Sequence, residues 1–484
     1  MDLLRFFYQI LIGNFMSKLF LIIAEVLILF YLPNDQFGTF VFLQGLIISG
    51  SVISVWGADQ AIINAAGRNS SKKHDISTYH HSSRVRIFWA SIPISILAAV
   101  IAEFSNALID NITLLLLTVI IVIEAQLILN SALLRAKSRA YLAVLYLDGF
   151  RHIFLLLVAL IIILLDLNLT FIIFGWLFAA VISFVCGNIA IFGIFKEKLA
   201  QVRMADADGM HADTIAKFSG IWSFTQVVIS RMIIILSGYF FTADELGTIA
   251  FFMKLMIIFT FLQTVMLQSI APVIGKVSRV ENIEDAKMIF KNTTIFLACV
   301  VAPAAGVCLL TLNPLMIFFG IEWNYSLTAV YALIFAQALN IGTGLIGQFI
   351  IHFGYAKNLL FISLFGALLQ CVLFYLLATQ FGMPGVLLSY AITSVFLVLS
   401  KNIFSRNRIG FDGLQFVNLG VIGFAIIMFF TFESLFDIST KAINFTAITL
   451  YIITSVFFVI WIIKIGTEIK ISSILIKDKN NETR

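Results

Sequence analysis

The chain has 484 residues, of which 61% are hydrophobic and only 12% are charged. Soluble domains carry about a quarter charged residues, so this composition excludes a soluble globular protein and predicts an integral membrane protein. The formal net charge of +5 does not indicate nucleic-acid binding, because the basic residues are distributed as a membrane topology signal. All four cysteines lie inside apolar runs, which favours small hydrophobic residues over disulfide or metal ligands.

A helix that crosses about 30 Å of hydrocarbon needs about 20 apolar residues. Fourteen stretches of the sequence meet this criterion. In chain order we expect membrane helices over residues 10–31, 38–64, 87–104, 112–134, 142–165, 169–195, 218–241, 246–273, 293–312, 327–351, 359–380, 384–400, 416–435 and 443–463. The first is too long for the core of a signal peptide, so we expect it to be retained.

The connections between these helices alternate in charge. Even-numbered connections hold most of the basic residues, whereas the odd-numbered ones hold acids and, as their only base, Lys441. Because basic residues collect on the cytoplasmic side of a membrane, we expect both termini in the cytoplasm. The longest hydrophilic connection, 196–217, then also lies in the cytoplasm and joins two halves of the chain.

The two halves contain a repeat, because residues 31–42 resemble residues 240–251 at an offset of 209. The identical positions are Asp35 and Asp244, Gly38 and Gly247, Thr39 and Thr248, and Phe42 and Phe251. Six helices per copy, an even number, make the copies parallel, related by an axis along the membrane normal. We therefore expect a six-helix lobe over 1–205, a second over 206–410, and two further helices with a cytoplasmic tail over 411–484.

Eight ionisable residues lie well inside the apolar segments, where a charge costs about 2.5–3.5 kcal/mol and is usually kept for function. They are Lys18, Glu25, Asp59, Glu124, Asp148, Arg151, Arg231 and Lys254. All four acids belong to the first half, and the second half contributes only cations. Arg231 and Lys254 are therefore expected to meet a first-half acid, a hydrated cavity or an anionic ligand.

The three deeper acids are candidates for ion coupling: Glu25, Glu124 and Asp148. Glu25 and Glu124 also fit hydrogen-bonded packing residues. Asp148 also fits a structural ion pair with Arg151, because residues three apart share a helix face.

The tenth expected helix is unusually polar. Its amides, Gln337, Asn340 and Gln348, suit the hydroxyl groups of a sugar, and they equally suit hydrogen bonds between helices.

Several motifs of catalytic proteins are missing from the sequence. It contains no GxxxxGK[ST] nucleotide-binding loop, no HExxH metal motif and no GxSxG nucleophile motif. No external connection exceeds about 15 residues, which leaves no room for a folded catalytic domain outside the membrane. We therefore expect no catalytic residues, no cofactor and no metal site.

The sequence resembles a family of polysaccharide transporters at several places. The run 30–38 is similar to the L-x-P-E-x-F/Y-G turn after their first helix, although Asn34, Asp35 and Gln36 stand where Glu is commoner. The run 56–62 resembles the end of their second helix. The start of the seventh helix at Trp222, then Arg231, Glu245-Leu246-Gly247 and Lys254-Leu255, resemble their seventh and eighth helices. These are the O-antigen and capsule flippases of the multidrug/oligosaccharidyl-lipid/polysaccharide (MOP) exporter superfamily.

The resemblance implies an all-α membrane protein of MATE-like fold, with two six-helix lobes in a V around a central cavity and two extra C-terminal helices. It implies alternating access in a bacterial inner membrane. The substrate would be an undecaprenyl-diphosphate-linked oligosaccharide, passed to the outer leaflet among membrane lipids and beside the polymerase and chain-length proteins of its pathway. Arg231 and Lys254 would contact the diphosphate, with Arg151 and Lys18 behind them.

Three other functions compete with this one. A cation-coupled multidrug antiporter of the same superfamily would need acids in the cavity. A lipid II flippase would carry a closely related substrate. A membrane polysaccharide polymerase would lengthen glycan chains without moving them between leaflets.

Overall fold

The computed structural model describes residues 2–68, 73–105, 109–136, 140–194, 206–256 and 283–414, with isolated positions between 259 and 267 and at 423. Every regular element in these ranges is a helix, and the expected all-α, MATE-like fold class is confirmed. Eight of the described helices are long and apolar enough to cross a membrane. They coincide with eight of the expected spans. The spans expected at 416–435 and 443–463 fall almost wholly outside the described residues.

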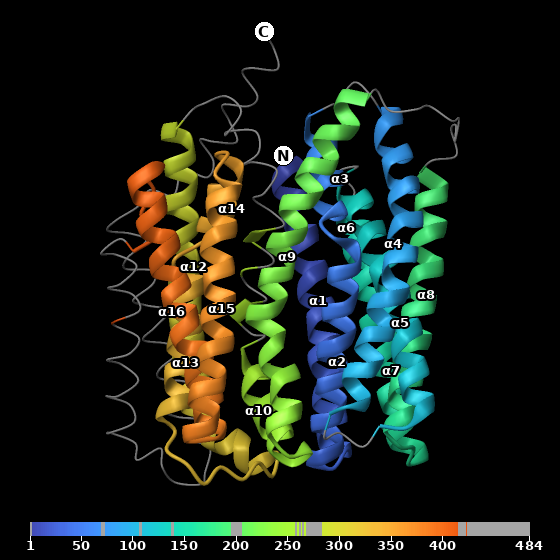
Figure 1. Cartoon of the computed structure of the whole chain (residues 1–484), viewed down its shortest axis with the longest axis vertical. Coiled ribbons are helices and arrows are strands. Elements are labelled where there is room, and N and C mark those ends of the chain that lie inside the picture. The colour runs from blue at the N-terminus through green and yellow to red at the C-terminus, as the bar shows by residue number, and fades with distance from the viewer. Residues whose placement is uncertain are drawn as a thin grey trace. The chain divides into compact units, whose positions relative to one another are not determined.

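Figure 1 labels the described helices and colours them in chain order from blue at the N-terminus. Those of the first half are α1 (Asp2–Tyr31), α2 (Asn34–Val55), α3 (Ala58–Arg68), α4 (Lys73–Glu103), α5 (Asn111–Ala136), α6 (Ala140–Ala143), η1 (Val144–Gly149), α7 (Phe150–Leu165) and α8 (Leu169–Ile194). Those of the second half are α9 (Asp206–Phe240), α10 (Ala243–Leu255), α12 (Ile283–Phe318), α13 (Thr328–Gly342), α14 (Ile346–His352), α15 (Ala356–Phe381) and α16 (Met383–Arg408).

Three helices expected to be continuous are interrupted. The expected helix 38–64 breaks where Trp56 and Gly57 both have positive φ, +46° and +74°. The expected helix 327–351 breaks at Gly344, with φ +84°. A helix cannot continue through such left-handed residues. The expected helix 142–165 is interrupted by the π-helical turn η1. Hydropathy does not detect these breaks, because each lies inside a stretch that is apolar on average.

The contacts of the chain group it into two compact units. Unit 1 comprises 1–8, 254–355 and 391–484, and unit 2 comprises 9–253 and 356–390. In unit 2, α2 packs against α4, α5 and α9, while α9 also packs against α3 and α15. The lobe boundaries expected from the repeat, at 205 and 410, stay a prediction.

The two copies of the repeated turn touch each other within unit 2. Asn34 Nδ2, at the start of α2, donates to the backbone oxygen of Asp244 at 3.0 Å and to its Oδ1 at 2.7 Å. Gly38 lies against the backbone of Ala243 and Gly247, and Gly247 lies against the backbone oxygen of Asn34. The matched glycines therefore let α2 and α10 cross in backbone contact, as small residues do between membrane helices.

Unit 1 has an aromatic core at the start of α12. The ring centroids of Phe290 and Phe411 are 5.3 Å apart with planes at 15°, and Phe349 lies 5.0 Å from Phe290. Phe353 adds a fourth ring, 5.2 Å from Phe411. Such ring pairs stabilise a core beyond their buried area. Phe411 thereby holds the segment that follows α16 against α12 and α14.

Candidate functional site

Unit 2 brings six of the ionisable residues in the apolar segments into one charge cluster. Lys18 and Glu25 come from α1, Glu124 from α5, Asp148 from η1, Arg151 from α7 and Arg231 from α9. The ammonium of Lys18 is close enough to interact electrostatically with Glu25, Asp148, Arg151 and Arg231. Arg231 interacts in the same way with Glu25 and with Tyr390 of α16. We refer to Lys18, Glu25, Glu124, Asp148, Arg151 and Arg231 as the charge cluster.

Arg151 is the paired cation of this cluster. Its Nη1 lies 2.5 Å from Glu124 Oε2, and its Nη2 lies 3.4 Å from Asp148 Oδ1. The other Glu124 oxygen accepts a hydrogen bond from Trp176 Nε1 at 3.1 Å. The expected pair of Asp148 and Arg151 is present, but the shorter contact of Arg151 is with Glu124. The charge of Arg151 is therefore already compensated by the protein.

The π-helical turn η1 supplies Asp148 immediately before α7. A π turn widens the helix by one residue and is often found at functional sites. Gly149 closes this turn, and a Cβ at that position would lie 3.2 Å from the backbone oxygen of Val144. Asp148 and Arg151 both face Lys18 of α1 across this junction.

His152 joins α7 to α1. Its Nδ1 lies 3.0 Å from the backbone oxygen of Ser17 and 2.8 Å from Ser17 Oγ, and its Nε2 lies 3.3 Å from Arg151 Nη2. A carbonyl oxygen only accepts and a guanidinium only donates. Nδ1 therefore carries the proton and Nε2 accepts from Arg151. His152 is neutral in this arrangement and adds no charge to the cluster.

Lys18 and Arg231 differ from Arg151, because neither belongs to an ion pair among the described residues. Both side chains are half-buried. Each lies inside a helix that we assign to the membrane, where a charged group needs water, a partner or a ligand. Glu25, whose Oε1 accepts from Gln44 Nε2 at 2.9 Å, is the acid that both cations face.

The charges of the cluster balance. Lys18, Arg151 and Arg231 contribute three positive charges, and Glu25, Glu124 and Asp148 contribute three negative ones when ionised. Tyr390 and Glu25, an acid of the first half, lie within electrostatic range of Arg231, but no ion pair joins Arg231 to Glu25 among the described residues. This arrangement can hold an anion beside Lys18 and Arg231.

The other residues expected in the site belong to unit 1. Lys254 is half-buried in the last turn of α10. Gln337 is buried on α13 and accepts a hydrogen bond of 3.5 Å from Asn340 Nδ2. Gln348 is half-buried on α14, beyond the break at Gly344. This bond joins two residues of the same helix, so it is not the bond between helices that was the alternative for these amides, and both interpretations stay predictions.

Sequence reasoning missed four residues that shape the cluster: Ser17, Gln44, Trp176 and Tyr390. Three of them are uncharged side chains far along the chain from their partners. His152, for example, bonds Ser17 at a separation of 135 residues, and Trp176 bonds Glu124 at a separation of 52. Only Gln44, 19 residues from Glu25 and on the next helix, carried a usable signal, namely a lone amide in an apolar run.

Comparison with known proteins finds likeness in structure but none in sequence. No family model matches the chain, and no curated protein matches it. A lipid II flippase in an inward closed conformation superposes with a TM-score of 0.68 at 14% identity, covering 94% of this chain and 99% of the flippase. An outward-facing MATE multidrug transporter of the MOP superfamily gives 0.59 at 13% identity, and the MATE multidrug transporter DinF-BH gives 0.62 at 14%. For both, the alignment covers 84% of this chain and 95% of the other. The chain therefore has the fold of MOP superfamily transporters.

Proposed function

We propose that this protein moves an undecaprenyl-diphosphate-linked oligosaccharide, a precursor of O-antigen or capsule, from the cytoplasmic to the outer leaflet of a bacterial inner membrane by alternating access. The observation that carries the proposal is the pair Lys18 and Arg231, two half-buried cations without an ion pair among the described residues, in a fold shared with a lipid II flippase. Two like charges in a medium of low dielectric constant repel each other. A diphosphate between them offsets that repulsion.

In this proposal two sets of side chains bind the two parts of the substrate, the diphosphate and the sugars. Lys18 and Arg231, with Arg151 and Lys254, attract the diphosphate, because charge-assisted hydrogen bonds to phosphate are among the strong ones. Gln337, Asn340 and Gln348 bind sugar hydroxyls. The lobes expected over 1–205 and 206–410 alternate around the substrate, and both termini face the cytoplasm. The polymerase and the chain-length proteins of the pathway are its expected neighbours.

The membrane potential favours the direction of transport. Moving one negative charge outward across a membrane that is negative inside releases about 2.3 kcal/mol per 100 mV. The protein then needs to supply only a polar path and a site for the anion. No nucleotide hydrolysis is required for this step.

The balanced charge cluster adds ion coupling to the proposal. A diphosphate adds negative charge to a cluster whose own charges sum to zero. Uptake of a proton at Glu25, Glu124 or Asp148 would restore the balance, because a nearby anion favours the protonated form of a carboxylate. Glu25 lies within electrostatic range of both Lys18 and Arg231, so a diphosphate bound to these two cations would compete with Glu25 for them.

The proposal is tested in a strain whose only copy of the gene carries Arg231→Gln and Lys254→Gln. We expect surface polysaccharide to be lost while the protein still inserts into the membrane. Lys357→Gln is the matched control, because Lys357 is an exposed lysine at the start of α15, outside the cluster. Normal surface polysaccharide in the double variant would refute the assignment of these residues.

Two alternatives are kept because specific observations favour them. The three acids of the charge cluster suit a cation-coupled drug antiporter, which would confer resistance to cationic dyes on expression. The likeness to a lipid II flippase over 94% of the chain suits that substrate. In that case depletion of the protein would be lethal, whereas loss of an O-antigen or capsule flippase would remove only the surface glycan.

A further inference from the structure

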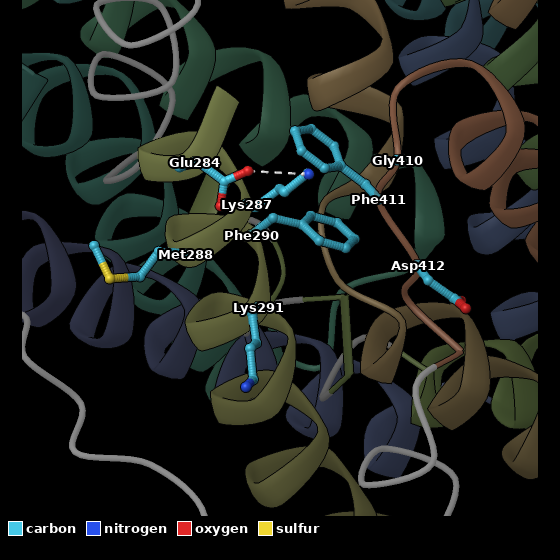
Figure 2. Close-up of a pocket in the computed structure, with 8 residues that line it drawn as sticks. All are labelled: Glu284, Lys287, Met288, Phe290, Lys291, Gly410, Phe411 and Asp412. Atoms are coloured by element: carbon cyan, nitrogen blue, oxygen red, sulfur yellow. Dashed lines mark hydrogen bonds and ion pairs between the residues drawn. The ribbon is translucent and has the colours of Figure 1, made fainter. Parts of the chain in front are cut away.

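We infer that unit 1 carries a binding site for the headgroup of an anionic glycerophospholipid, in a cavity between the start of α12 and the segment that follows α16. The cavity has a volume of about 280 Å³ and is lined by Lys287, Lys291, Phe290 and Phe411, among others (Figure 2). It belongs to neither the charge cluster nor the amides of α13 and α14. The inference therefore does not depend on the proposed transport function.

Two lysines border the cavity from one helix. Lys287 and Lys291 are four residues apart on α12, so they lie one above the other on the same face. Figure 2 shows the ammonium of Lys287 turned toward Glu284, while the side chain of Lys291 extends the other way along the helix. The distance from Lys287 Nζ to Glu284 Oε1 is 3.2 Å. Lys291 is exposed and belongs to no ion pair among the described residues.

The charges at the cavity leave one cation over. Asp412 lies 3.9 Å from Arg406 and accepts a hydrogen bond from the backbone nitrogen of Leu414 at 2.9 Å. Glu284 is paired with Lys287. The lining holds two lysines and two acids, and both acids have a partner, Lys287 for Glu284 and Arg406, outside the lining, for Asp412. Lys291 is therefore the lining cation without an ion pair among the described residues, and its charge is +1. A singly charged phosphate diester matches this charge.

The floor of the cavity is rigid and apolar. Phe290 and Phe411 are buried and stacked, as described above, and Met288 adds an apolar side chain that is 37% exposed. Gly410, with φ +82°, lies close to the end of the Lys287 side chain, and a Cβ at this position would be 3.5 Å from Lys287 Cε. A lipid needs both properties at once, a cationic side for its phosphate and an apolar side for the start of its acyl chains.

The level of the cavity matches that of lipid headgroups. The membrane span of α12 begins at Ala286, one residue before Lys287, and the span of α16 ends at Arg408, two residues before Gly410. The distribution of basic residues assigns these two helix ends to the cytoplasmic side. Anionic lipids give that leaflet a negative surface, and basic pockets between membrane helices bind their headgroups there.

The test measures lipid retention by the purified full-length protein. Native mass spectrometry in detergent with equal amounts of phosphatidylglycerol and phosphatidylethanolamine should show preferential binding of phosphatidylglycerol. Lys291→Gln should weaken that binding about fivefold. The double variant, which carries both Lys287→Gln and Lys291→Gln, should weaken it by about a factor of five for each of the two lysines. Lys357→Gln should leave it unchanged. Lys291 is exposed, so its substitution does not endanger folding, and an unchanged thermal transition without added lipid verifies this.

Three results would overturn the inference. The first is equal retention of the two lipids by the unmodified protein. The second is undiminished phosphatidylglycerol binding by the double variant. The third is displacement of the lipid by millimolar inorganic phosphate, which would make the cavity a site for free phosphate instead of a lipid.

Discussion

The crossing of α2 and α10 gives a sharp test of the packing in unit 2. In Gly38→Ala the new Cβ would collide with the backbone oxygen of Ala243 and the backbone nitrogen of Gly247. Backbone atoms cannot change rotamer, so α2 must move away from α10. Such overpacking costs about 1–3 kcal/mol. Separation of the helices also weakens the hydrogen bonds of Asn34 to Asp244, worth about 0.5–1.5 kcal/mol each.

The matched control lies two turns further along α2. In Gly45→Ala the new Cβ would lie 3.6 Å from Ile234 Cγ2, an ordinary contact. Alanine is favoured over glycine in a helix interior by about 1 kcal/mol, so this variant should be as stable as the unmodified protein or more so. The two substitutions are chemically identical and are predicted to act with opposite signs.

Thermal unfolding of the purified proteins in one detergent measures the difference. We expect the midpoint of Gly38→Ala to fall below that of the unmodified protein, and the midpoint of Gly45→Ala to equal or exceed it. Equal midpoints for the two variants, or a higher midpoint for Gly38→Ala, would refute the backbone contact between α2 and α10.

Two further pairs of substitutions test the charge cluster and the aromatic core. Glu124→Gln leaves the guanidinium of Arg151 without its nearest counter-charge and should lower the free energy of unfolding by about 3–5 kcal/mol. Asp148→Asn should lower it by about 1 kcal/mol or less, because Asp148 is partly exposed and its carboxylate lies 3.4 Å from Arg151. Thermal unfolding compares the pair, and equal losses would contradict the described geometry. Phe411→Ala should lower the free energy of unfolding by about 3–5 kcal/mol, because the ring is buried. Phe361→Ala is the control, because that ring is 58% exposed and its loss should change the unfolding midpoint little. A Phe411→Ala variant as stable as the unmodified protein would show that this ring does not hold the segment after α16.

Much of the fold could be predicted because membrane helices leave a simple signal. Twenty apolar residues mark a span. The direction of each span, expected from the alternation of basic connections, stays a prediction. The sequence repeat also corresponds to a contact in the structure, because the matched residues Gly38 and Gly247 meet where α2 and α10 cross. The interruptions were not predictable in the same way. The π turn before Asp148 and the left-handed residue Gly344 change the local geometry without changing hydropathy.

The sequence identified the charged residues of the cluster as buried in apolar segments, but it did not predict their pairings. The contact between Asp148 and Arg151 followed from helical spacing, because the two are three residues apart. The shorter contact of Arg151 with Glu124 spans 27 residues and depends on how α5 and α7 pack. Likewise, the first-half acid that faces Arg231 is Glu25, and no local pattern selects it over Glu124 or Asp148. Tertiary packing decided which cations of the charge cluster belong to an ion pair.

Leaflet transfer by the purified protein tests the central claim, that an anionic lipid-linked passenger binds at Lys18 and Arg231. Proteoliposomes would carry a labelled undecaprenyl-diphosphate-linked oligosaccharide, and the fraction reaching the opposite leaflet would be measured over time. We predict transfer by the unmodified protein and by Lys357→Gln. A loss of about tenfold or more is predicted for the variant with Lys18→Gln and Arg231→Gln, because each hydrogen bond to a charged group is worth about 1.5–3 kcal/mol. Equal transfer rates in all three proteins would contradict the account.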